Sequence, residues 1–207
     1  MRIVSAAYTL MVSLIAGEVA LAQTLPNPPV LDWRKVVTEA DKLKLTHWRE
    51  AFTTAITNAR NEGEGDAITR EGALLEADAG LEKPAIGEGT YSCRMIRLGR
   101  KGTYTKTLSI RPPSRCILSN SNGRLGFIMM DGSQRPRGNI FPGNDRRQIF
   151  LGTMAFGDET RWMGYGRDPA RDMVGALERI GEQRWRILLP EPGFDSLMNV
   201  IELTPTN

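Results

Sequence analysis

A change of pattern at Gly87 constrains the fold of this chain more than any other feature. After Gly87, short segments rich in Tyr, Ile, Phe, Met and Val are separated by Gly, Pro, Asn and Asp, which is typical of β-strands joined by tight turns. Asn122-Gly123 predicts a hairpin, because both residues tolerate a positive φ. The predicted strands cover residues 90–98, 103–110, 115–119, 124–130, 138–141, 147–154, 173–180, 184–189 and 197–203.

Apolar and polar side chains alternate within these segments. Trp185, Ile187 and Leu189 share one face of their segment, whereas Arg184 and Arg186 share the other. Such alternation favours an antiparallel sheet with one buried face and one face in water. No long helical pattern interrupts the strands, which argues against a parallel α/β sheet. The pattern predicts a closed or nearly closed up-and-down barrel, or a sandwich.

The stretch before residue 85 has a helical pattern instead. Apolar residues recur at intervals of three to five between residues 36 and 59. Asp32 or Thr38 is the predicted cap at the start, and Gly63 is the predicted left-handed residue at the end. A shorter helix is predicted over 67–77. The predicted fold class is therefore α+β, a short N-terminal helical segment followed by an antiparallel β-barrel-like domain.

Residues 1–22 have the pattern of a secretory signal peptide. Arg2 supplies the positive start, residues 6–16 form the apolar run, and Ala20-Leu21-Ala22 supplies small residues for the peptidase. A helix needs about 20 apolar residues to cross a bilayer, and the run at 6–16 is shorter than that. No integral membrane segment is therefore predicted after cleavage. We expect a periplasmic or secreted protein divided into a signal peptide at 1–22, a Pro-rich leader and helical segment at 23–85, and a β domain at 86–207.

The chain has two cysteines, Cys93 and Cys116. An oxidising compartment favours a disulfide between them. The alternative is a reactive or metal-binding pair of thiols. Since His47 is the single histidine and lies in the helical stretch, further soft ligands are lacking, and neither a metal nor a cofactor is predicted.

The positive charge is concentrated in the β domain. Residues 23–85 carry 8 basic and 11 acidic side chains, whereas residues 86–207 carry 18 basic and 12 acidic ones, and 16 of those 18 are Arg. The planar guanidinium suits phosphate and carboxylate groups, so anionic material of a cell envelope is a predicted ligand. The alternative is that these Arg side chains pair with acidic residues across the sheet. Because the charges are interleaved, nucleic acid is not a predicted partner.

Two charged segments are candidates for a site. The segment 132–138 combines flanking glycines with Arg135 and Arg137, and is either an anion-binding loop or a solvated linker. Asp168 and Asp172 are an alternative catalytic pair for glycoside hydrolysis, which needs two carboxyl groups about 5 to 9.5 Å apart. The competing interpretation of this second segment is a turn started by Asp-Pro.

Aromatic residues supply the apolar part of a predicted ligand site. Tyr165 and Trp185, together with Trp162, are candidates to stack on a ligand at the mouth of a barrel, although such residues are also common in cores. The predicted ligand-binding residues are Arg135, Arg137, Tyr165 and Trp185.

Several segments resemble a known family. These are YSCRMIRLG at 91–99, GSQRPRG at 132–138, YGRDP at 165–169 and GALERIG at 175–181, followed by Arg184-Trp185-Arg186. Together they resemble an uncharacterised family of exported bacterial proteins, domain of unknown function 4893, from about Trp33 to the C-terminus. The resemblance implies export and a cysteine pair that includes Cys116, but no activity. Gly89-Thr90-Tyr91 also resembles the Gly-x-Trp start of lipocalin-type barrels, with Tyr in place of Trp, which favours a lipocalin-like up-and-down barrel over a sandwich.

The leading functional hypothesis is non-enzymatic binding of an anionic or amphipathic envelope ligand, such as a lipid, a glycan or a muropeptide. One alternative is an envelope glycan hydrolase that uses Asp168 and Asp172. The other is a protein-binding, inhibitor-like module.

Overall fold

The computed structural model describes residues 32–101, 106–157, 159, 161, 163–193 and 196–206. The predicted signal peptide at 1–22, the Pro-rich stretch at 24–29 and Trp162 lie outside the described residues. The helices are α1 (Glu39–Thr46), α2 (Trp48–Ala59) and α3 (Gly65–Glu71), with short 3-10 turns at Trp33–Lys35 and Gly72–Leu75 and a π-turn at Arg60–Glu64. The strands are β1 (Gly89–Leu98), β2 (Leu108–Ile110), β3 (Ser114–Ser121), β4 (Arg124–Met129), β5 (Gln134–Phe141), β6 (Gln148–Phe156), β7 (Asp172–Gly181), β8 (Arg184–Pro190) and β9 (Met198–Pro205).

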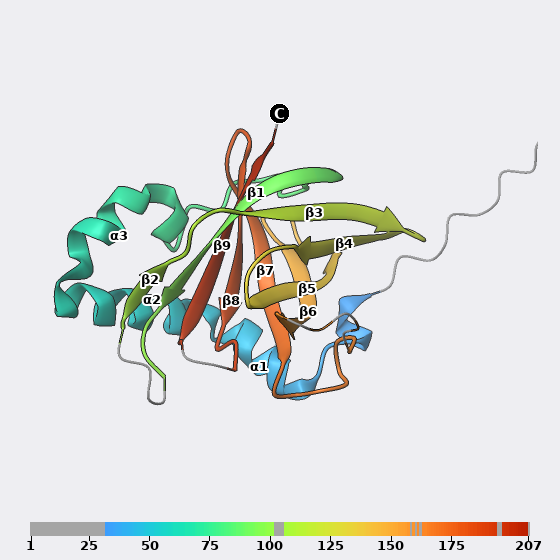
Figure 1. The fold of residues 1–207 in the computed structure, drawn as a ribbon, viewed down its shortest axis with the longest axis horizontal. Helices are drawn as coiled ribbons and strands as arrows, with labels where there is room; N and C mark the ends of the chain where they lie inside the picture. The colour runs from blue at the N-terminus through green and yellow to red at the C-terminus, as the bar shows by residue number, and fades with distance from the viewer. Residues whose placement is uncertain are drawn as a thin grey trace, which may run out of the picture.

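Eight of the described strands close into an antiparallel barrel. From β3 to β9 each strand pairs with the next one in the chain, and β9 returns to pair with β1, from Tyr91 opposite Pro205 to Leu98 opposite Met198. β1 also pairs with β3, while β2 extends the sheet beside the end of β1. Figure 1 shows this fan of strands with the helices at its lower and left sides. The predicted α+β fold with an up-and-down barrel is confirmed.

Large apolar side chains fill the interior of the barrel. Phe127 of β4 and Phe150 of β6 meet edge to face with their ring centroids 5.8 Å apart. Cys93 of β1 and Cys116 of β3 form a disulfide inside this core, with Cα atoms 5.9 Å apart, so the predicted bond is confirmed. Alternation along the strands therefore directs one face inward, as the period of two predicts.

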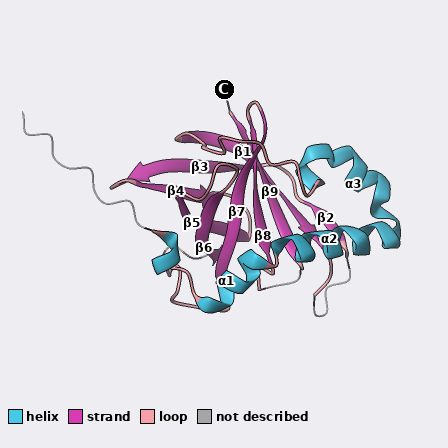
Figure 2. Ribbon diagram, turned by 180° about the vertical axis from the view of Figure 1, so that it is seen from behind, coloured by secondary structure: helices cyan, strands magenta, loops and turns pink. Residues whose placement is uncertain are grey.

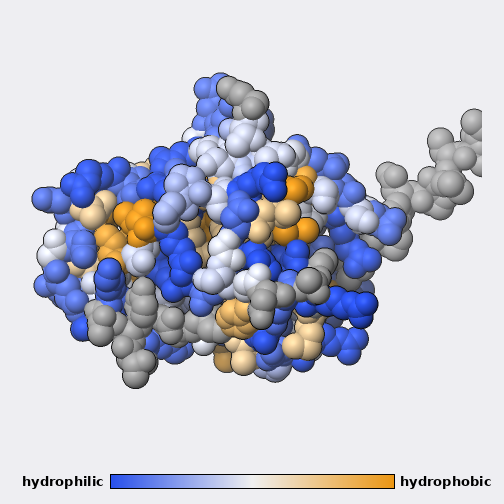
Figure 3. Space-filling view, viewed as in Figure 1, coloured by the Kyte–Doolittle hydropathy of each residue, from blue (hydrophilic) through white to orange (hydrophobic). Residues whose placement is uncertain are grey.

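The helices cover part of the outer face of the barrel. Phe52, Ala55 and Ala59 lie along one side of α2 and pack with Leu188 and Val200 of the sheet, because their spacing places them on a single helical face. Figure 2 shows α1 and α2 crossing the strands on this side. In Figure 3, the opposite view, hydrophilic residues cover most of the surface and apolar ones are scattered among them.

The predicted caps lie at element ends. Thr38 accepts a hydrogen bond from the N–H of Asp41 at the start of α1, and Asp32 caps the 3-10 turn that precedes it. Gly63 adopts a φ of 90° at the kink after α2. α3 ends at Glu71, earlier than the predicted helix over 67–77, because Gly72 has a φ of 54°.

The prediction of a glycine-bounded loop over 132–138 is wrong in its second part. β5 begins at Gln134, so Arg135 and Arg137 are strand residues on the outer face. Pro136 lies within this strand, although proline is rare within sheets. Here the pairing of β5 with β4 begins only at Arg137, and Pro136 lies opposite Met154 of β6, where its missing N–H costs no bond to β4.

Candidate binding sites on the outer face of the barrel

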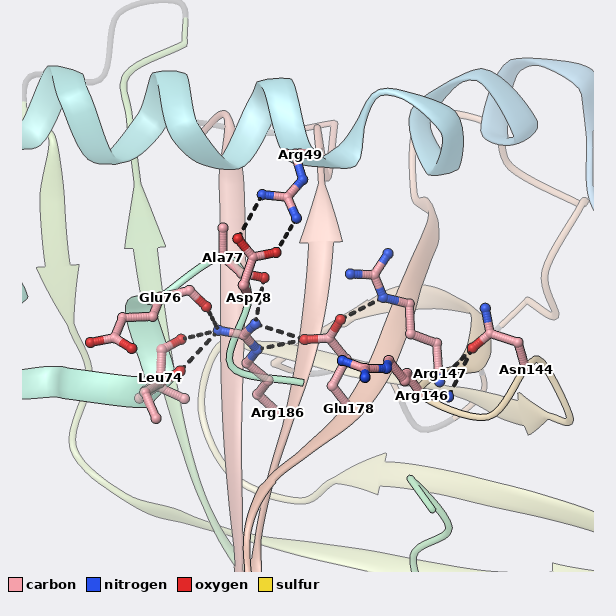
Figure 4. Close-up of polar contacts among 11 residues, drawn as sticks. Arg49, Leu74, Glu76, Ala77, Asp78, Asn144, Arg146, Arg147, Glu178 and Arg186 are labelled. Atoms are coloured by element: carbon pink, nitrogen blue, oxygen red, sulfur yellow. Dashed lines mark hydrogen bonds and ion pairs between the residues drawn. The ribbon is translucent and has the colours of Figure 1, made fainter. Parts of the chain in front are cut away.

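A buried ion pair joins the helical segment to the sheet. Glu178 of β7 and Arg186 of β8 lie opposite each other in register, and their side chains are 1% and 0% exposed. Arg186 donates from Nε and Nη2 to Glu178 Oε2 at 2.9 and 2.7 Å. It also donates to backbone carbonyls after α3, and these belong to Ala73, Leu74, Glu76 and Ala77 (Figure 4). One guanidinium therefore fixes this segment against the barrel.

Arg147 extends this network toward the surface. Its Nε donates to Glu178 Oε1 at 2.5 Å, and its guanidinium lies 3.9 Å from the centre of the Trp48 ring. Asn144 shapes the preceding turn by accepting the N–H groups of Arg146 and Arg147 through Oδ1. Among the described residues, the terminal nitrogens Nη1 and Nη2 of Arg147 make no hydrogen bond. Glu178 and Trp48 thus hold the guanidinium while leaving two donor groups for a ligand.

A cleft of about 530 Å³ opens beside Arg147, between α1 and the β5–β6 turn. We call it the tryptophan cleft, and it is lined by Trp33, Arg34, Lys42, Leu45, Thr46, Trp48, Gly143, Asn144, Arg147, Ile149 and Ala176. Two indole rings and three aliphatic side chains give apolar walls, while Arg34, Lys42 and Arg147 supply positive charge. None of these lining residues is acidic. Each of the three cations also pairs with an acidic side chain outside the lining, and these partners are Asp32, Glu39 and Glu178. The cleft therefore combines apolar surface with cationic hydrogen-bond donors.

A second hollow contains two of the predicted site residues. Arg137 and Tyr165 line a groove of about 360 Å³ over β3 to β6, which we call the Gly126 groove. Its other lining residues are Ser119, Ser121, Asn122, Arg124, Gly126, Phe127, Ile128, Gly138, Asn139, Leu151, Gly152, Thr153 and Gly164. Burial lowers the pKa of Arg137, and the charge of Arg135 acts in the same direction.

Tyr165, which lines this groove, is fixed by contacts with Asp41 of α1 and with Thr38, the residue before α1. Its hydroxyl donates to Oδ2 of buried Asp41 at 2.6 Å and accepts the N–H of Thr38 at 3.1 Å. Burial, followed by the hydrogen bond to Asp41, raises the pKa of Tyr165 to about 12. The phenol is therefore neutral at physiological pH and joins the loop before β7 to the helical segment.

The structure does not bring Arg135 and Trp185 to either hollow. Arg135 donates to the carbonyls of Phe156, Gly157 and Glu159, which organises the end of β6. Trp185 packs edge to face on Tyr91, with ring centroids 6.2 Å apart, and its Nε1 donates to the carbonyl of Ala85 at 3.3 Å. These contacts hold the fold together, and a ligand role for either residue stays a prediction.

Asp168 and Asp172 both make contacts typical of a turn. Asp168 accepts the N–H of Ala170 at 3.1 Å and pairs with Arg171 at 3.2 Å. The carboxylate of Asp172 is buried and accepts the N–H of Gly166 with both oxygens. Burial raises the pKa of Asp172. Neither residue lines the tryptophan cleft or the Gly126 groove, and their use in hydrolysis stays a hypothesis.

Sequence reasoning missed the tryptophan cleft. Trp33 and Trp48 fall in the helical segment, whereas Arg147 lies between β5 and β6. These side chains are far apart in the sequence, and their meeting depends on how α1 packs on β5 to β7.

Two kinds of feature are absent from the described residues, a metal-type cluster and a membrane-spanning helix. No cluster of three or more His, Cys, Asp or Glu suited to a metal ion occurs there. Within the same ranges, no helix is long and apolar enough to span a bilayer.

Comparison with known proteins identifies a family. A family model described as a domain of unknown function (DUF4893) matches residues 33–203, which include α1 to α3 and nearly all of the barrel. Searches of curated proteins and of solved structures found no match. The predicted resemblance is confirmed, and the chain belongs to the DUF4893 family.

Proposed function

We propose that this protein is an exported, non-enzymatic binding protein that holds an anionic, amphipathic envelope ligand in the tryptophan cleft. The observation that carries the proposal is the lining itself, which sets two indole rings beside three cationic side chains without an acidic one. A ligand with an apolar body and a phosphate or carboxylate group complements both parts. The cleft volume of about 530 Å³ lies in the range usual for small-molecule sites.

Arg147 is the residue we assign to the anionic group. A guanidinium is suited to paired hydrogen bonds with phosphate or carboxylate oxygens. Because Glu178 and Trp48 already hold Arg147 in place, binding costs less side-chain entropy than it would at a mobile surface arginine. Leu45, Ile149 and the two tryptophans then exclude water from the apolar part of the ligand.

Export is the second part of the proposal. The pattern of residues 1–22 supports it, and the disulfide between Cys93 and Cys116 is typical of oxidising compartments. An exported protein meets phosphorylated lipids and acidic glycans. The cationic side chains that line the cleft suit the anionic groups of such ligands.

The test is a titration of the oxidised protein with decyl phosphate below its micelle concentration, followed by tryptophan fluorescence and calorimetry. We expect saturable binding of decyl phosphate and much weaker binding of decyl maltoside and decyltrimethylammonium. Arg34→Gln/Lys42→Gln should weaken binding several-fold, whereas Lys35→Gln, an exposed neighbour outside the lining, should not. Equal binding of the three amphiphiles, or none, would contradict the proposal.

A further inference from the structure

Gly126 lies within β4, at a position where neither the backbone conformation nor the available space requires a glycine. Its φ is outside the left-handed region, and a Cβ built there would meet its nearest neighbours, the carbonyl oxygens of Ser119 and Gly138, at 3.4 and 3.9 Å. These are ordinary contacts, so a side chain fits. By contrast, a Cβ on Gly138 or Gly152 would meet backbone oxygens at 2.3 Å. Glycine weakens a strand, and at Gly126 it leaves a hollow instead of relieving a clash.

The hollow is surrounded by hydrogen-bonding side chains at regular sheet positions. Ser119 of β3 and Asn139 of β5 are the register partners of Gly126 on either side, and Ser121 lies opposite Arg124 one step along the same face. Thr153 of β6 lies opposite Arg137. The groove thus presents hydroxyl and amide groups together with guanidinium groups around Gly126, which has no side chain.

Its charge is of one sign. None of the described residues that line the groove is acidic, and Arg124 is exposed without an ion-pair partner among the described residues. Tyr165, fixed by Asp41 and Thr38, adds an aromatic side chain to the lining. Sugars are bound by such sets of hydroxyl and amide partners, while Arg adds paired hydrogen bonds to a carboxylate or phosphate.

We propose that the Gly126 groove binds an anionic sugar unit, that is, a sugar bearing a carboxylate or a phosphate. The sugar hydroxyls face Ser119, Asn139 and Thr153, and the anionic group faces Arg124. This site is independent of the tryptophan cleft, because the two linings share no residue.

The test uses glucuronic acid, glucose 1-phosphate and glucose as probes, with binding followed by NMR chemical shifts. We expect both anionic probes to bind about tenfold or more tightly than glucose, since a charge-assisted hydrogen bond is lost in the neutral sugar. The carboxylate and phosphate arms distinguish an acidic glycan from a phosphosugar as the natural source.

Gly126→Val fills the hollow and should abolish binding, with its fold checked by thermal unfolding. Arg124→Gln keeps the hollow and should weaken the anionic probes about tenfold while leaving glucose nearly unchanged. Arg115→Gln removes the same charge from an exposed β3 position outside the groove and should bind like the wild type. Wild-type affinity in both folded groove variants, or equal affinity for the three probes, would overturn the inference. Decyl phosphate binding should be unchanged in Gly126→Val, so the two proposals fail separately.

Discussion

Replacing Arg186 with Met measures what the buried ion pair contributes. The side chain of Arg186 is 0% exposed and that of Glu178 is 1% exposed, so the substitution leaves a carboxylate in the interior with Arg147 as its remaining partner. Four backbone carbonyls after α3 also lose their donor. Breaking a buried pair by removing one partner costs about 3 to 5 kcal/mol. In a domain of this size that lowers Tm by roughly 6 to 20 °C.

The assay is thermal and urea unfolding followed by circular dichroism, with two comparisons. Glu178→Leu/Arg186→Met removes both charges and should be more stable than Arg186→Met alone, because no carboxylate is then buried with Arg147 as its single charged partner. Arg49→Met removes an arginine of the exposed pair with Asp78 (Figure 4) and should have a much smaller effect. If Arg186→Met is no less stable than Arg49→Met, the buried pair does not hold the helical segment on the barrel.

Three further predictions concern other interactions of the fold. Replacing Cys93 and Cys116 with Ala should cost about 3 kcal/mol, from the entropy of a loop with a sequence separation of 23, and dithiothreitol should lower the wild-type urea midpoint to match. Tyr165→Phe leaves buried Asp41 without its hydroxyl donor and should cost about 1 to 3 kcal/mol in the same assay; an unchanged midpoint would refute this. The pKa of Asp172 is raised in the folded state, so the stability linked to its protonation is present at low pH and lost as the pH rises through that pKa. Asp172→Asn should therefore gain stability relative to the wild type as the pH rises above about 4, and a constant difference across pH would contradict the assignment.

The strands were predictable because local patterns specify them. Alternation and the Asn122-Gly123 turn depend on neighbouring residues, and in the structure that turn has φ values of 53° and 75°. The disulfide followed from counting two cysteines and from the predicted compartment. Closure of the barrel agrees with the general rule that an open sheet leaves unpaired edges, which a closed sheet removes.

The sites were less predictable because they join residues distant in the chain. Arg137 and Tyr165 line one groove, whereas Arg135 and Trp185 donate to backbone carbonyls elsewhere, and a ligand role for all four stays a prediction. An arginine side chain can bind an anionic ligand or donate to backbone carbonyls of its own chain. The sequence does not show which carbonyls a folded loop leaves without donors. Arg186 is the clearest case, since it was predicted on a solvated face and is instead covered by the helical segment.

A crystal structure of the protein with decyl phosphate tests the central proposal most directly. We expect phosphate oxygens within hydrogen-bonding distance of the terminal nitrogens of Arg147, and the alkyl chain against Trp33 and Trp48. Ligand density inside the barrel, or a phosphate bound away from Arg147, would contradict it.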